Sequence, residues 1–326
     1  INTPTALSGG VPLSRDRGPV QGYRLGPSDA SLEGRAKADA AARASAVLPK
    51  IMAFCHSNEY YGHGQVLRAY CGIEGAVPIR GRVQHGWMAC AVDYAGAYTD
   101  ENMLVAPTFV WSQRVADSLR RSAPETHIGG APYLYLPPEP DPGPMGNGLL
   151  IAPGHSLNSG RVAGSWRATA AAMRTFAEQS GFAFATALLH WHDRDGEARQ
   201  AFAELGIESV CAGNPTSTDF LYRLRYYLRA HAAVVSNRLS TVLFYGLHEG
   251  RGAYMAGPPA VLEEPDIEDE FVMSPPWVAD HYPGIFAGGL SGAPEAASEL
   301  GVAFKQSPAD LRNCAFGWLY ASEEAA

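Results

Sequence analysis

The segment 234–247, VVSNRLSTVLFYGL, contains the residues whose spacing is most informative about chemistry. Ser236 and Asn237 follow two valines, and Ser240 and Thr241 precede an apolar stretch. A buried strand that ends in small polar residues before a helix leaves backbone N–H groups and hydroxyls where a phosphate can bind. The alternative is that Ser240 only caps the helix. We expect these four residues to hold a diphosphate.

Two arginines lie in or just after this segment. Arg238 lies inside it and Arg251 follows it, so either guanidinium could neutralise a diphosphate leaving group. Each could equally be an ordinary surface charge. We assign Arg238 to the diphosphate site.

A second polar loop, PGHSLN at 153–158, follows an apolar segment that reads as a strand. Loops at the carboxyl ends of parallel strands are where such sheets bind ligands, so His155 and Ser156 are candidates for phosphate or sugar contacts. The alternative is an ordinary loop. The nucleophile elbow of hydrolases requires glycine where Asn158 stands, which argues against that class.

A third loop, HWHDRD at 190–195, could act in several ways. His190 and His192 lie on the same side of an extended chain and could share a metal, and Asp193 with Asp195 has a spacing that can hold Mn²⁺ or Mg²⁺. A base or ribose contact is as compatible with the loop. We assign His190 to ligand binding and expect no metal site.

His85 is the first candidate for a general base, in the segment QHGW at the end of a predicted strand. An unperturbed imidazole titrates near neutral pH and could deprotonate a hydroxyl, while the following glycine limits crowding. The alternative is a buried histidine bonded to backbone. His56 and His63 flank another loop expected at the same sheet edge and are rival bases.

Strands that alternate with helices must position these loops, so we predict an α/β fold with parallel sheets. The segment 137–148, PPEPDPGPMGNG, is a linker that no regular element can cross. We therefore expect two Rossmann-like domains, at 1–140 with an irregular N-terminal arm and at 149–305. A final segment, 306–326, contains a helix that could pack back on the first domain.

The expected elements follow from apolar runs and helix start signals. Strands are predicted at 51–54, 78–85, 109–112, 149–152, 183–189, 209–211, 232–235 and 252–255. Helices are predicted at 30–47, 65–70, 113–122, 166–180, 197–205, 219–230 and 308–322, the last capped by Ser307, with an irregular stretch from 260 to 274.

Composition excludes several classes of protein. The formal net charge of −8 argues against a nucleic-acid surface, which requires clustered Lys and Arg. Five scattered cysteines without a CxxC pair make a disulfide framework or structural zinc site unexpected and fit a reducing cytoplasm. No apolar run reaches the roughly 20 residues of a membrane span. The oligomeric state stays open.

Several fragments taken in order resemble a known family. They are QHGW at 84–87, PTFVWS at 107–112, GAPYLY at 130–135, PGHSLN at 153–158 and the segment 236–246. Together they are similar to bacterial surface-carbohydrate (capsule or O-antigen) biosynthesis proteins of the GT-B glycosyltransferase type. The His85-Gly86 pair resembles one in teichoic-acid polymerases, whose histidine is implicated as a base. The resemblance covers about residues 50–260.

This resemblance implies two Rossmann-like domains that face one another across a cleft, with a nucleotide-sugar donor on the second and a carbohydrate or small-molecule acceptor on the first. Many such enzymes bind ribose through a glutamate in the helix after the phosphate loop. Here Glu249 comes late in that helix, which departs from the pattern.

The expected function is therefore a metal-independent glycosyltransferase in which His85 deprotonates the acceptor hydroxyl. We expect no cofactor beyond the nucleotide-sugar substrate. Three alternatives remain: a nucleotide-sugar epimerase, another polysaccharide-modifying transferase on the same scaffold, and a non-catalytic protein that binds carbohydrate or nucleotide.

Overall fold

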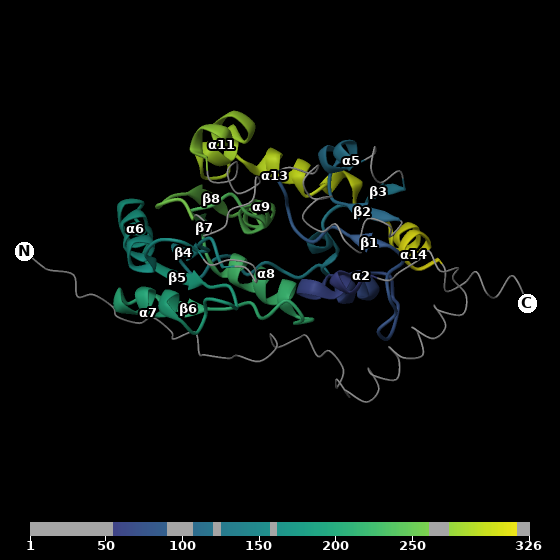
Figure 1. Ribbon diagram of the computed structural model, residues 1–326, viewed down its shortest axis with the longest axis horizontal. Coiled ribbons are helices and arrows are strands. Elements are labelled where there is room, and N and C mark those ends of the chain that lie inside the picture. The colour runs from purple at the N-terminus through teal and green to yellow at the C-terminus, as the bar shows by residue number, and fades with distance from the viewer. Residues whose placement is uncertain (1–54, 90–106, 120–124, 157–161, 261–273, 318–326) are drawn as a thin grey trace, which may run out of the picture.

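A computed structural model describes residues 55–89, 107–119, 125–156, 162–260 and 274–317. Two sheets form, and every strand pair within them is parallel (Figure 1). The first sheet has the order β1-β2-β3, with β1 at Arg82–Val83, β2 at Thr108–Val110 and β3 at Thr126–Ile128. The predicted α/β fold with two Rossmann-like halves is confirmed. The division into domains at 140 and 305 stays a prediction.

The second sheet has five strands in the order β6-β5-β4-β7-β8. Its central strands are apolar and buried along their whole length, as expected of parallel strands covered on both faces. The bounds are β4 Gly148–Ile151, β5 Phe184–Leu188, β6 Glu208–Val210, β7 Ala233–Ser236 and β8 Gly252–Met255.

Helices cover both faces of the second sheet. Leu149 and Ile151 point to one face and pack with residues of α6 (Trp166–Gln179) and α7 (Glu197–Glu204). Leu150 and Val234 point to the other face, toward α8 (Phe220–Ala230) and α9 (Thr241–His248). In Figure 1, α6 and α7 lie on the outer side, and α8 and α9 lie on the side of the first sheet.

The two halves share one hydrophobic core. Trp87 from the first half packs against Phe244 of α9 with 5.0 Å between ring centroids, and Tyr133 stacks on Tyr245 at 4.0 Å. Around the first sheet lie η1 (His56–Gly62), α2 (His63–Tyr70), α5 (Gln113–Leu119) and η2 (Pro132–Tyr135). The halves therefore meet through packed aromatic side chains.

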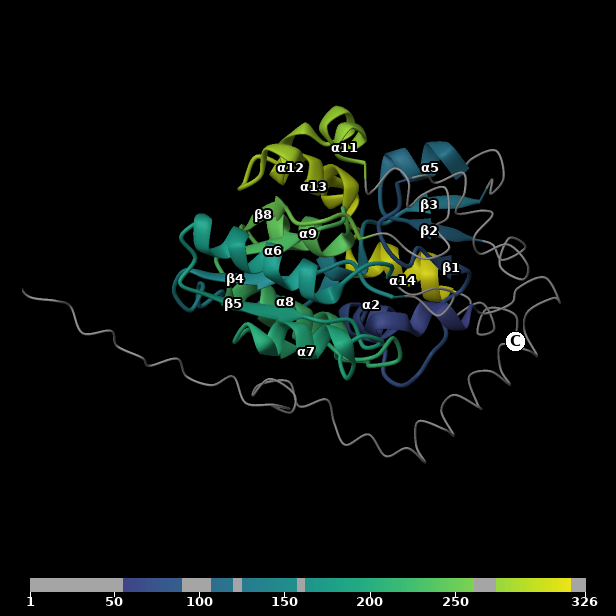
Figure 2. The ribbon, with the colours of Figure 1, turned by 60° about the vertical axis from the view of Figure 1, so that its left-hand side comes forward.

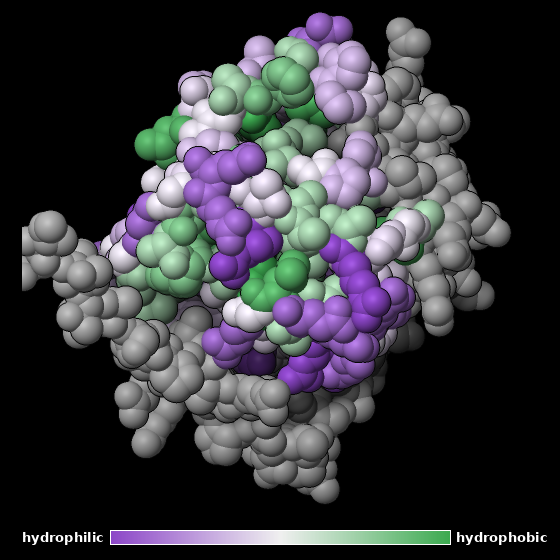
Figure 3. All heavy atoms as spheres, turned by 90° about the vertical axis from the view of Figure 1, so that its left-hand side faces the viewer, coloured by the Kyte–Doolittle hydropathy of each residue, from purple (hydrophilic) through white to green (hydrophobic). Residues whose placement is uncertain are grey.

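The C-terminal helices complete the structure. α11 (Pro275–His281), α12 (Pro283–Ala287) and α13 (Ala293–Glu299) lie above β8 and α9 in Figure 2, and η3 (Val302–Phe304) follows them. α14 (Pro308–Phe316) returns to the first half, where Arg312 donates a hydrogen bond to the Cys71 carbonyl. None of the described helices has the length and apolar character to span a bilayer. On the face in Figure 3, hydrophilic side chains interrupt the hydrophobic ones.

Several predicted elements differ from the structure. The predicted strand 78–85 contains only β1, because Gly81, at φ 84°, turns the chain just before it. No helix was predicted at 275–299, where α11, α12 and α13 form. The Ser307 cap is confirmed, since Ser307 Oγ accepts from the Asp310 N–H at 3.2 Å. The predictions for 30–47, 51–54 and 318–322 lie outside the described residues.

Candidate functional site

The carboxyl edge of the second sheet brings the predicted polar loops together. The strand order reverses direction between β4 and β7, and ligands of doubly wound sheets bind outside the carboxyl ends of the strands at such a point. The loop 153–156 follows β4, the loop 190–195 comes after β5, and the loop 237–240 follows β7 and leads into α9. Residues predicted from three separate segments thus lie at one edge.

Asn237 holds this edge together. Its Oδ1 accepts the Gly154 N–H at 2.8 Å and its Nδ2 donates to the Pro258 carbonyl at 2.7 Å, so one side chain ties the loops after β4, β7 and β8. Ser236 Oγ accepts the Arg238 N–H at 3.2 Å. Both side chains are buried. Asn237 and Ser236, predicted to contact ligand, therefore shape the loop in this structure.

Replacing Asn237 with alanine should lower the free energy of unfolding by about 2 kcal/mol, because the buried Gly154 N–H loses its acceptor and the Pro258 carbonyl loses its donor. Urea unfolding measures the change. Asn147→Ala is the matched control, since its amide bonds the Gly181 carbonyl at an exposed site. Equal losses in the two variants would show that Asn237 does not organise the loops.

His155 and His190 form a stacked pair at the ends of β4 and β5. Their ring centroids are 3.9 Å apart at an interplanar angle of 14°. His155 Nδ1 lies 2.9 Å from the Ser156 carbonyl, which can only accept, so this nitrogen carries the proton. Both ring nitrogens of His190 are buried without a hydrogen-bond partner among the described residues.

Burial keeps this pair neutral. Desolvation lowers the pKa of His190 to about 2, with a further contribution from His155. Desolvation also lowers the pKa of His155, which the Ser156 carbonyl partly opposes and nearby Arg238 reinforces. Two neutral imidazoles offer hydrogen-bonding nitrogens without adding positive charge.

The carboxylates of Asp193 and Asp195 serve separate purposes. Asp193 is buried and its Oδ2 accepts the Ser156 N–H at 3.0 Å, whereas Asp195 pairs at the surface with Arg194 at 2.9 Å. Within the described residues, no group of three or more His, Cys, Asp or Glu side chains is arranged to hold a metal ion. The loop 190–195 is therefore tied to the loop after β4 through Asp193.

The first turn of α9 contains Ser240 and Thr241. Ser240 does not cap the helix, and its Oγ is buried without a hydrogen-bond partner among the described residues. Thr241 Oγ1 accepts the Trp87 N–H at 3.0 Å and keeps its own proton to donate. These hydroxyls are less open to solvent than the sequence suggested, and each has unused hydrogen-bonding capacity.

The same Trp87–Thr241 bond places His85 beside α9. The His85 ring lies 4.7 Å from Tyr61 and 6.1 Å from His63, measured between centroids. Nδ1 of both histidines is buried and unpartnered among the described residues. The side chain of His56, the other rival base, lies outside the described part of the chain. Sequence reasoning did not single out Tyr61, although the pair Tyr60-Tyr61 before a glycine marked the position.

Burial also keeps His85 and His63 neutral. Desolvation, with a smaller contribution from Arg82, lowers the pKa of His85 to about 4. Desolvation, with a smaller contribution from His85, lowers the pKa of His63 to about 3. Both imidazoles are unprotonated at neutral pH and can accept a proton.

These shifts predict how stability depends on pH. Both folded-state pKa values lie below the ordinary value near 6.5, so the stability linked to neutral imidazoles is complete above about pH 6.5. It is lost as pH falls toward the folded-state values, because the unfolded chain then binds more protons. Each such histidine steepens the decline by about 1.4 kcal/mol per pH unit.

Urea unfolding at pH 7, 6 and 5 measures this decline. His63→Gln should flatten it, whereas His281→Gln, at an exposed position on α11, should leave it unchanged. An equally steep decline in His63→Gln and the unaltered protein would contradict the neutral buried state of His63.

Two residues considered for the ligand lie elsewhere. Arg251 precedes β8 at the opposite edge of the sheet and pairs with Asp141 at 2.5 Å. Glu249, the candidate ribose ligand, follows the last turn of α9 and pairs with Arg229 at 2.5 Å. An eight-residue helix is about 12 Å long, so neither residue is at the α9 N-terminus. Arg251 as a diphosphate contact and Glu249 as a ribose ligand are therefore corrected.

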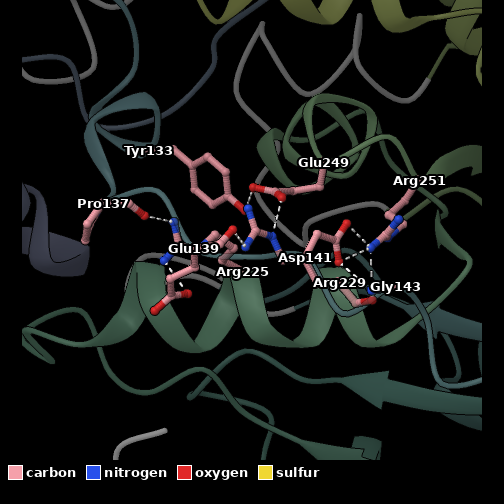
Figure 4. A network of polar contacts seen from close by, with 9 residues as sticks. All are labelled: Tyr133, Pro137, Glu139, Asp141, Gly143, Arg225, Arg229, Glu249 and Arg251. Carbon is pink, nitrogen blue, oxygen red and sulfur yellow. Dashed lines mark hydrogen bonds and ion pairs between the residues drawn. The ribbon is translucent and has the colours of Figure 1, made fainter. Parts of the chain in front are cut away.

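Both residues belong to a network that fastens the linker to the second half (Figure 4). Arg225 of α8 donates to the Pro137 carbonyl at 2.8 Å and pairs with Glu139 at 2.7 Å. The Tyr133 hydroxyl donates to Glu249 at 2.9 Å. In the linker, Glu139 and Asp141 alternate with prolines, and this pattern could have indicated carboxylates held in place to pair with arginines.

Comparisons with known proteins give fold-level matches alone. No protein-family model matches the chain, and no curated protein sequence matches it. A Listeria monocytogenes structure described as a UDP-N-acetylglucosamine 2-epimerase is 11% identical, with TM-score 0.40, over 74% of this chain and 67% of its own. MnaA of S. aureus, solved with UDP, is 10% identical, with TM-score 0.42, over 79% and 70%. UDP-GlcNAc 2-epimerase from Neisseria meningitidis, bound to UDP-GlcNAc, is 11% identical, with TM-score 0.33, over 71% and 66%.

The predicted glycosyltransferase is corrected by this finding. Two of the three structures carry the description of a 2-epimerase and the third is a UDP complex, and none is described as a glycosyltransferase. At these identities and TM-scores, the likeness assigns neither an activity nor a residue role to this chain. A nucleotide-sugar epimerase was among the alternatives that the sequence left open.

Proposed function

We propose that this protein binds a nucleotide sugar at the N-terminus of α9 and epimerises its sugar. One observation supports this more than any other: the Trp87 N–H donates to Thr241 Oγ1 at 3.0 Å. This bond joins the loop that carries His85 to the first turn of α9. The chain segment of the candidate base His85 therefore contacts the helix end that would bind the anion.

The diphosphate would bind at the first turn of α9. The N-terminus of a helix attracts anions through its free N–H groups and its dipole. Ser240 Oγ is buried and unpartnered, so it can donate to a phosphate oxygen without breaking an existing bond. Arg238 lies beside Gly154 and influences His155, which places positive charge at the same edge.

The sugar would be handled by His85. Changing the configuration of a carbon that bears hydrogen requires a group that accepts a proton and a place for the negative charge that develops. Neutral His85 has an unpartnered Nδ1, and His63 is a second neutral imidazole 6.1 Å away. When His85 takes the proton from the carbon next to the anomeric carbon, the C–O bond to the diphosphate would break, so that the negative charge develops on the departing diphosphate, where the α9 N-terminus would stabilise it. Re-addition of the diphosphate, with a solvent-derived proton delivered to the opposite face of the carbon, would give the epimer.

A thermal-shift screen tests the binding step. The ligands are UDP, GDP, CDP, TDP and CMP, each with and without EDTA. We expect one diphosphate to stabilise the protein regardless of chelator, by about 2.7 kcal/mol at 100 times its Kd. Stabilisation that requires Mn²⁺, or none with any ligand, would contradict the proposal.

Ser240→Asp sharpens this test. Aspartate is favoured at a helix N-terminus, where it can accept backbone N–H groups and its charge complements the helix dipole, so the free protein should stay folded, which urea unfolding checks. Its carboxylate would occupy the phosphate position and repel the phosphate, so the ligand should no longer raise the melting temperature. Ser274→Asp is the matched control, because Ser274 caps α11 away from this edge. A full shift in Ser240→Asp would place the ligand elsewhere.

A further inference from the structure

Tyr61 has an unusual backbone conformation for its residue type. It is the one non-glycine residue with positive φ in the described part of the chain, at φ 55° and ψ 21°. A bulky side chain is uncommon in this left-handed region, and such outliers gather at functional sites. The Tyr61 N–H donates to the Pro215 carbonyl at 2.6 Å, so a loop of the second half fixes this conformation.

The conformation places the Tyr61 ring where the two halves meet. Its centroid lies 4.7 Å from His85 of the first half and 4.6 Å from Phe220 of the second. The next residue, Gly62, also has positive φ, and an added Cβ would lie 2.4 Å from the Thr218 carbonyl oxygen. The chain thus approaches the second half so closely that only glycine fits behind the tyrosine.

Unused polar atoms surround this ring. His63 is 2% exposed, and its Nδ1 has no hydrogen-bond partner among the described residues. His85 Nδ1 is in the same state. Burying a polar nitrogen without a partner is costly, so a ligand that supplies hydroxyl groups would satisfy both. The Tyr61 hydroxyl likewise makes no hydrogen bond to another described residue.

The chemistry of this cluster matches a sugar ring. An apolar ring face with a few convergent polar groups is the usual lining of a small-molecule site. Burial, with a smaller contribution from Tyr60, raises the pKa of Tyr61 to about 12, so its hydroxyl stays protonated and can donate. Gly86, next to His85, lies beside Thr241, where an added Cβ would be 3.5 Å from Oγ1. The cluster therefore adjoins the proposed diphosphate position.

We infer that Tyr61 recognises the sugar of the bound nucleotide sugar, with its ring against the pyranose and its hydroxyl donating to a sugar hydroxyl. This inference rests on the proposed function. Tyr61 is then a specificity residue that distinguishes a nucleotide sugar from the nucleoside diphosphate alone.

Paired titrations test this role. Calorimetry on the full chain gives Kd for UDP and UDP-GlcNAc, GDP and GDP-mannose, and dTDP and dTDP-glucose. For the pair that binds, Tyr61→Phe should raise the Kd of the nucleotide sugar by about 5-fold, which corresponds to the loss of one hydrogen bond. The Kd of the free nucleoside diphosphate should stay unchanged. The aromatic contacts remain in this variant, so thermal stability should hold.

Two further variants complete the design. Glycine at position 61 accepts the same backbone conformation but has no ring. Tyr61→Gly should therefore raise the Kd of the nucleotide sugar by more than Tyr61→Phe does. Tyr254→Phe, on β8 against Phe176, is the control and should change neither Kd. If Tyr61→Phe changed the Kd of both ligands equally, or of neither, the role of Tyr61 would be wrong while the proposed function would stand. An unaltered protein that binds no probe would overturn the proposed function and this inference together.

Discussion

Replacing His85 with glutamine is expected to lower kcat for epimerisation by about 10²- to 10⁴-fold, the usual contribution of a general base. Glutamine fills a similar volume but cannot take up the proton. Because the diphosphate contacts come from α9, Kd for the nucleoside diphosphate should stay within about 2-fold. Steady-state rates and calorimetry on the same preparation measure both quantities.

His248→Gln provides the comparison for this variant, because His248 is exposed in the last turn of α9. Its kcat should match that of the unaltered protein. If His85→Gln turned over at the normal rate, the base would have to be sought at His63. If it lost diphosphate affinity in proportion to kcat, His85 would be a binding residue and not a base.

Replacing Glu249 with alanine should lower the free energy of unfolding by about 3–5 kcal/mol. The Glu249 side chain is 8% exposed and its partner Arg229 is 17% exposed, so the change leaves a largely buried guanidinium without its carboxylate. The Tyr133 hydroxyl loses its acceptor at the same time. Urea unfolding measures the loss directly.

Glu204→Ala is the matched control. Glu204 pairs with Arg167 at 2.9 Å, but the two side chains are 42% and 67% exposed, so its removal should change stability by less than about 0.5 kcal/mol. Similar losses in Glu249→Ala and Glu204→Ala would show that the linker network contributes little. Binding of nucleotide should survive in both variants, because Glu249 lies at the far end of α9.

The second half of the fold was predictable because its signals are local. Continuous apolar strands such as Leu149–Ile151 and Ala233–Val235 leave little choice but a buried parallel sheet. The first half was harder, because Gly81 shortens β1 and the aromatic core depends on partners from α9. α12 and α13 were missed because each is short, and the proline that begins α12 and the glycine just before α13 also signal a turn.

The site was predictable only in part, because only some of its contacts have local sequence signals. Loops at the carboxyl edge of one sheet must converge, and His155 and His190, which were assigned separately to ligand binding, meet because β4 and β5 are neighbouring strands. The bond from Trp87 to Thr241 joins residues 154 positions apart and leaves no local signal. Arg251 follows Thr241 closely in sequence, yet a helix separates them in space, so proximity along the chain was misleading.

The central claim is that the protein converts a nucleotide sugar without any acceptor. Proton NMR can follow the protein with UDP-GlcNAc, GDP-mannose or dTDP-glucose in D₂O, with His85→Gln as the matched inactive sample. We predict that one substrate gives a second set of sugar signals, and that deuterium replaces hydrogen at the carbon whose configuration changes. A tightly bound nucleotide sugar that stays unchanged, with no deuterium taken up, would contradict the account.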